Sequence, residues 1–146
     1  MRIDPTSAIA LYLVLAVCAA HAEATPKGKA AVPRIDCAAA TDGPELTHCA
    51  EIRLKKADSD LATVLDKVKG QIGKRAGANT DERTRWATAL DAAHTAWIAY
   101  READCRELVP FEWKSGTGAS LAVLECMAQM TEQRGFELTE RYADGR

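Results

Sequence analysis

The stretch from His94 to Cys105 contains a histidine, two aromatic residues, an arginine and a cysteine. A cysteine near a histidine can act as a nucleophile when its thiol is free and has a lowered pKa. Cysteine and histidine can also hold zinc, but the spacing of Cys37, Cys49 and His94 matches no zinc motif. We therefore predict no catalytic cysteine, no metal site and no bound cofactor.

Paired carboxylates occur at Asp58 and Asp60, as a glycosidase would need. Residues two positions apart on a helix point in different directions, so these two cannot face one substrate together. Ser115 lies in no nucleophile-elbow motif. The sequence thus predicts a protein that is not an enzyme.

The first residues indicate export. An apolar run over residues 8–20 is too short for a permanent membrane span, and Ala-His-Ala at residues 20–22 matches a cleavage signal. We predict a signal peptide over residues 1–22, a periplasmic or secreted location, and no transmembrane anchor in the mature form. The alternative is a lipid anchor on Cys18, which Val17 disfavours because that position normally holds Gly, Ala or Ser.

Composition limits the partners of the exported chain. The formal net charge of −2 provides no basic surface for nucleic acid or anionic membrane. An even number of cysteines in a small exported domain predicts two disulfides. The four cysteines beyond the signal peptide are Cys37, Cys49, Cys105 and Cys126.

The elements that position these residues are helices. Residues 23–34 lack an apolar period and predict a flexible leader, with the folded domain at residues 35–146. Three segments of helical periodicity follow, the second after a capping box at residues 79–82. The sequence predicts an all-α fold, a small antiparallel three-helix bundle. The apolar stripes are Leu46, Ala50, Leu54, Ala57, Leu61, Val64, Leu65, Val68 and Ile72; Trp86, Leu90, Ala93, Trp97 and Tyr100; and Leu121, Leu124, Ala128, Thr131, Gly135, Leu138 and Tyr142.

Antiparallel packing predicts that the disulfides cluster at one end of the bundle. The start of the first helix, the end of the second and the start of the third meet there. Three pairings of the cysteines are open. We favour Cys37 with Cys49 and Cys105 with Cys126, because each pair closes a loop without crossing the bundle.

The second helix also predicts structural contacts. Trp97 and Tyr100 are at core spacing, and His94 is expected to form a hydrogen bond beside the apolar stripe. Arg101 is expected to lie on an aromatic face or to pair with a carboxylate of another helix. The candidate carboxylates are Asp58, Glu125 and Glu132.

The order of these residues resembles the LprI-type family of small exported bacterial proteins, over about residues 37–142. The chain departs from the family at Ala62, where Asn is usual, and at His94, where Gln is common. The resemblance implies an exported helical protein whose best-known members are linked to inhibition of lysozyme. It rests on the four cysteines together with Ala57, Asp58, Leu61, Leu90, Trp97, Tyr100, Arg101, Thr131, Arg134 and Leu138, of which Asp58, Trp97, Tyr100, Arg101, Thr131 and Arg134 form a structural motif.

We therefore expect an exported, non-catalytic binding protein with a protein partner, lysozyme being the first candidate. A mildly acidic chain suits a basic lysozyme, although charge steers association more than it fixes affinity. The alternative is a structural or stress-related envelope protein that self-associates or binds another envelope component.

A Pro- and Gly-containing loop predicted over residues 108–119 provides the expected contact surface. We expect its aromatic residues to protrude, over residues 111–120, from the disulfide-bonded end and enter a partner's cleft. The alternative is that they fold back and cap the small core. The residues expected to bind the partner are Phe111, Trp113, Lys114 and Ser115.

Overall fold

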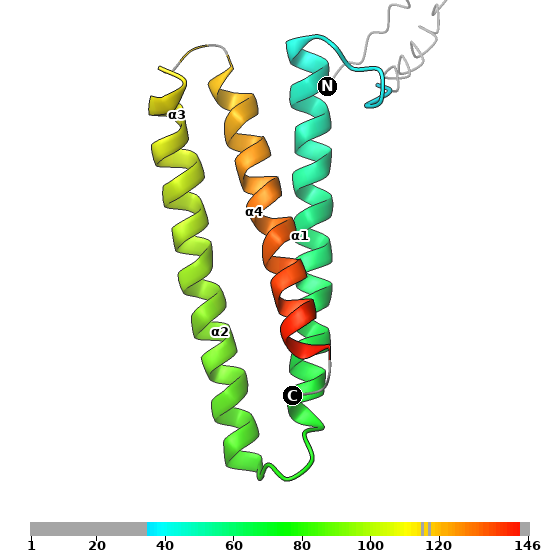
Figure 1. Cartoon of the computed structure of the whole chain (residues 1–146), viewed down its shortest axis with the longest axis vertical. Helices are drawn as coiled ribbons and strands as arrows, with labels where there is room; N and C mark the ends of the chain where they lie inside the picture. Colours follow the sequence, from blue (N-terminus) through cyan, green and yellow to red (C-terminus); the bar gives the residue numbers. More distant parts are fainter. Residues whose placement is uncertain (1–34, 115, 117, 144–146) are drawn as a thin grey trace, which may run out of the picture. The chain divides into compact units, whose positions relative to one another are not determined.

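The computed structural model describes residues 35–114, 116 and 118–143 (Figure 1). The predicted signal peptide and leader, with Cys18, lie outside the described residues. Within these residues the chain forms helices and no strand, which confirms the predicted all-α class. None of the helices in this part of the chain has the length and apolar character needed to cross a bilayer.

Helix α1 (Gly43–Gly73) is the longest element, with 31 residues. The Asp42 side chain caps its N-terminus by accepting the Glu45 backbone N–H at 2.8 Å. After α1, Gly77 adopts a φ of 80°, which a residue with a side chain rarely adopts. This glycine allows the tight turn that reverses the chain.

Helix α2 (Thr80–Glu102) begins at the predicted capping box. The Asn79 side chain accepts the Glu82 backbone N–H at 2.9 Å, and the Glu82 carboxylate accepts the Asn79 N–H at 2.9 Å. Two backbone donors that have no partner within the helix are therefore satisfied.

The prediction of a loop over residues 108–119 is wrong for its first part. The chain continues from α2 through a π-helical segment, η1 (Ala103–Leu108), into a short helix, α3 (Val109–Glu112). The Val109 N–H bonds to the Asp104 carbonyl, five residues back. Pro110 directly follows the π-helical segment and lies in the first turn of α3, so the helical path continues past it.

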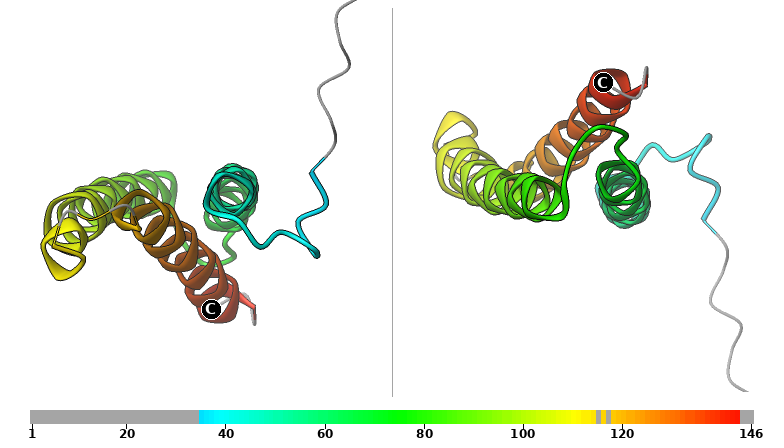
Figure 2. Two further views of the ribbon diagram at one scale, coloured as in Figure 1. Left: turned by 90° about the horizontal axis from the view of Figure 1, so that it is seen from above. Right: turned by 90° about the horizontal axis from the view of Figure 1, so that it is seen from below.

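Helix α4 (Ala119–Tyr142) completes the predicted three-helix bundle. It runs in the same direction as α1 and opposite to α2 (Figure 1). The end-on views show α4 inclined to both of its neighbours (Figure 2). Its contact with α1 is the most extensive between any two described elements.

The apolar core lies in the half of the bundle nearest the α1–α2 turn. There Leu138 of α4 is fully buried against α1, and Leu90 joins from α2. The predicted stripes of α1 and α4 are buried or half-buried, and in α2 Trp86, Leu90 and Trp97 pack in or against the core, whereas the prediction is wrong for Ala93 and Tyr100. Tyr100 is 59% exposed and Ala93 is also exposed, because α2 makes few contacts with the other two helices. The core cluster consists of Leu61, Leu65, Val68, Ile72, Leu90 and Leu138.

Candidate functional site

The four cysteines form the two predicted disulfides, Cys37–Cys49 and Cys105–Cys126. In both pairs the Cα atoms are 5.6 Å apart, a usual separation for a disulfide. The second bond joins the π-helical segment to α4, and its Cys105 side chain is fully buried. These sulfur atoms are neither thiol nucleophiles nor metal ligands, although a carboxylate of Asp104 lies within 4.8 Å of two of them.

Beyond the Cys105–Cys126 bond, large apolar side chains are exposed. Leu108 is 52% exposed, Phe111 77% and Trp113 53%. Lys114 follows them with a φ of 50°, in the left-handed region that disfavours a side chain. We call residues 108–114 the tip. Both of its aromatic residues are exposed, so the alternative in which they fold back and cap the core is wrong.

The tip is held by more than the disulfide. A Cβ atom at Gly118 would lie 2.8 Å from Cζ3 of Trp113, so only glycine lets this ring lie against the start of α4. Ser115, which we predicted to contact a partner, lies outside the described residues. The tip is therefore a short helical turn fixed to α4 through Cys105 and through the edge of Trp113.

Arg101 ties three helices together, as predicted. Its Nη1 atom donates to Asp58 Oδ1 of α1 at 2.7 Å and to Thr131 Oγ1 of α4 at 2.6 Å. Its guanidinium carbon lies 5.1 Å from the centre of the Trp97 ring. Because this guanidinium is buried and engaged on both sides, it holds the bundle rather than a ligand.

The other candidate partners of Arg101 have different roles. Glu132 accepts two hydrogen bonds from Arg53 of α1, the Nε to Oε1 distance being 2.8 Å. These bonds lower the pKa of Glu132 below its ordinary value. Glu125 is exposed and contributes only a long-range attraction to Arg53. Of the three candidate carboxylates, Asp58 is thus the partner of Arg101.

The contacts of His94 differ from those predicted. Its ring stacks on Trp97 with the centroids 5.7 Å apart, and its buried Nδ1 has no hydrogen-bond partner among the described residues. Burial lowers the pKa of His94, and the nearby Arg134 and Arg101 lower it further. The imidazole therefore packs as a neutral ring and does not form the expected hydrogen bond.

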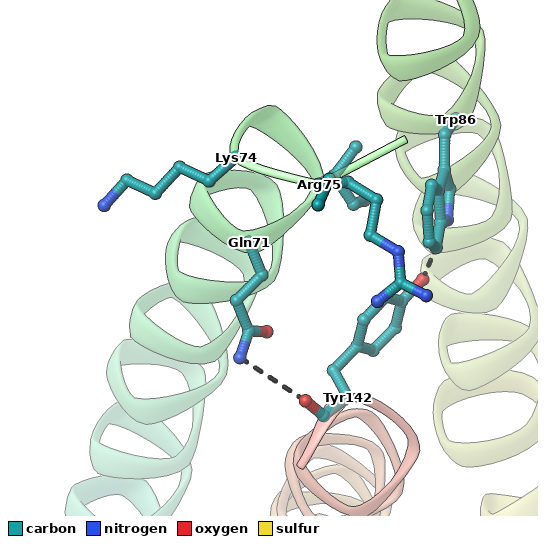
Figure 3. Close-up of a pocket in the computed structure, with 7 residues that line it drawn as sticks. Gln71, Lys74, Arg75, Trp86 and Tyr142 are labelled. Atoms are coloured by element: carbon teal, nitrogen blue, oxygen red, sulfur yellow. Dashed lines mark hydrogen bonds between the residues drawn. The ribbon is translucent and has the colours of Figure 1, made fainter. Parts of the chain in front are cut away.

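The opposite end of the bundle contains a pocket that the sequence did not reveal (Figure 3). It has a volume of about 470 Å³. Tyr142 accepts a hydrogen bond from Trp86 Nε1 on its hydroxyl at 3.2 Å and one from Gln71 Nε2 on its carbonyl at 3.3 Å. Arg75 points toward Tyr142, while Lys74 extends away from the other lining residues. The only signal of this pocket in the sequence was the basic pair Lys74 and Arg75, directly after the end of α1.

Comparisons with known proteins agree with this arrangement. A family model described as lysozyme inhibitor LprI matches residues 37–138. An uncharacterized protein of Rhizobium meliloti (strain 1021) is 33% identical over 119 residues, which cover 80% of this chain and 85% of that protein. No solved structure gives a significant match. The match to the family model includes both disulfides and Arg101 with its partners.

Proposed function

The chain belongs to the LprI family, and from this premise we propose that it is an exported, non-catalytic protein that inhibits a lysozyme through its tip. The bound partner would be the enzyme itself, with the tip inserted into a cleft on its surface. The disulfide-bonded end would hold the tip in position.

The exposure of Phe111 and Trp113 carries this proposal. Binding energy in protein interfaces concentrates in a few large side chains, and aromatic residues are enriched among them. A segment that is already ordered loses less conformational entropy on binding than a flexible loop does. Because the Cys105–Cys126 bond and α4 fix the tip, its aromatic residues can bind at a low ordering cost.

The experiment measures peptidoglycan lysis by c-type, g-type and i-type lysozymes with and without the oxidised protein. Phe111→Ala tests the tip, and Phe136→Ala is its matched control because Phe136 is 66% exposed on α4. If the proposal holds, Phe111→Ala raises the inhibitory concentration at least about tenfold and Phe136→Ala leaves it unchanged. Absence of inhibition in all three classes, or equal effects of the two variants, would overturn the proposal.

Self-association is the second candidate, since exposed apolar residues also lie outside the tip. Ile52 of α1 is half exposed, and Phe136 of α4 is more so. Exposed apolar side chains of this size can mark a contact between copies of an envelope protein. Sedimentation velocity over a hundredfold range of concentration tests it: a dimer that Phe136→Ala weakens and Phe111→Ala leaves intact supports self-association, and a monomer throughout rejects it.

A further inference from the structure

A polar groove between α2 and α4 is separate from the tip and has a volume of about 390 Å³. This volume lies within the range of small-molecule sites, roughly 300–1,000 Å³. Seven residues line it: Trp97, Tyr100, Asp104, Met130, Gln133, Arg134 and Glu137.

The groove has one aromatic side chain that is free to receive a ligand. Tyr100 is exposed, although its position within the helix predicted a core residue. Trp97 is less available, because the His94 ring stacks on it and the Arg101 guanidinium lies over it. The Tyr100 ring therefore forms the accessible aromatic wall.

The polar side chains of the groove retain unused hydrogen-bonding capacity. The half-buried Asp104 carboxylate has no hydrogen bond or ion pair with any other described residue. Arg134 is only 11% exposed, yet its contact with Glu137 is 3.6 Å, longer than a hydrogen bond. Gln133 donates from its amide to Glu137 at 3.1 Å and keeps its amide oxygen as an acceptor.

These groups favour a neutral ligand that both donates and accepts hydrogen bonds. Two carboxylates, Asp104 and Glu137, outnumber the one guanidinium, so the groove does not attract an anion. The guanidinium of Arg134 offsets one of these two carboxylates, so the excess charge is small and hydrogen bonding, rather than charge, selects the ligand. A pyranose has hydroxyls for these polar groups and a face of C–H bonds that can pack on an aromatic ring.

We propose that this groove binds a neutral oligosaccharide, with the sugar face on Tyr100 and the hydroxyls on Asp104, Arg134 and Gln133. The site shares no residue with the tip, and it does not depend on lysozyme inhibition. An exported protein with both features would contact a glycan and a protein through different surfaces.

Titration of the isotope-labelled, oxidised protein with chitotetraose and with cellotetraose tests the site, with backbone amide shifts as the readout. Saturable shifts confined to residues 97–104 and 130–137 with either sugar are expected. No saturable shift up to about 10 mM of either sugar would overturn the proposal. Saturable shifts with tetralysine in place of the sugars would also overturn it, because they would identify a site for basic peptides.

Two exposed aromatic residues provide the variant and its control. Tyr100→Ala should weaken sugar binding about tenfold or more, because it removes the packing surface. Phe111→Ala should leave sugar binding unchanged, because Phe111 lies in the tip and outside the groove. Equal weakening by the two variants, or none by Tyr100→Ala, would contradict the proposed site. Both residues are exposed, so the fold should survive either change.

Discussion

The two ends of the bundle are stabilised in different ways. At the α1–α2 turn, aromatic side chains pack inward: Trp86 and Tyr142 lie against the apolar core and hydrogen-bond to each other. At the other end, Phe111 and Trp113 are exposed, and a disulfide joins the π-helical segment η1 to α4. One end relies on buried apolar area and helix capping, and the other on covalent bonds.

This difference shows what a disulfide contributes besides stability. Small domains bury too little apolar surface to hold every element by packing alone. Near the tip the buried apolar residues are Cys105, Met127 and Ala128, of which only Met127 contributes a large apolar side chain. Because covalent bonds hold that end, its large apolar side chains can remain exposed without loss of the local structure.

The largest effect is expected from the core near the turn. Leu138→Ala should lower the free energy of unfolding by about 4 kcal/mol, because it removes buried methyl groups and leaves a cavity. Urea denaturation followed by circular dichroism measures the change. A decrease of less than about 1 kcal/mol in the free energy of unfolding would show that the end near the α1–α2 turn does not depend on apolar packing.

The next largest effect is expected at the disulfide-bonded end. Replacing Cys105 and Cys126 together by Ser should cost about 3 kcal/mol, as expected for a bond that closes a loop of this length. It should also weaken the proposed inhibition of lysozyme, because the tip loses its anchor. The double Ser variant of Cys37 and Cys49 is the control. Its free energy of unfolding, measured by denaturation, should fall, but its inhibition of lysozyme should be retained.

A smaller effect is expected from the cap at the turn. Asn79→Ala removes the acceptor of the Glu82 N–H and should cost about 1 kcal/mol. Asn79→Asp, which keeps a capping oxygen, should restore most of that stability. Thermal unfolding of the two variants side by side distinguishes the lost cap from a general effect of the substitution.

The smallest effect on stability is expected at the tip. Phe111→Ala should change the free energy of unfolding by less than about 0.5 kcal/mol, because the ring packs on little of the protein. A loss above about 2 kcal/mol would mean that this ring supports the fold, and the contrast between the two ends would fail.

The sequence predicted those features that depend on local periodicity and on connection length. The periodicity of Leu61, Val68 and Leu138 identified the buried faces of α1 and α4. Short connections placed the cysteines at one end but left three pairings open, and the favoured pairing, in which neither bond crosses the bundle, is the one observed.

Features set by the tilt of the helices could not be predicted. Tyr100 follows the same spacing as Trp97, yet Tyr100 is exposed, because α2 contacts its two neighbours much less extensively than α1 contacts α4. The change from α-helical to π-helical hydrogen bonding at Ala103 left no clear signal in the sequence. The groove beside Tyr100 and Asp104 was missed for the same reason, since it depends on how α2 and α4 cross.

Native-state amide hydrogen exchange on the double Ser variant of Cys105 and Cys126 tests the contrast between the two ends most directly. The variant should lower the free energy of global unfolding, which reduces the protection of every amide. We predict that the amides of residues 103–112 lose most of their protection in addition to this common reduction. Amides of residues 61–72 should still exchange only through global unfolding, because apolar packing holds them. An equal loss of protection at both ends, or none beyond the global loss at residues 103–112, would contradict the claim that the disulfide holds the tip.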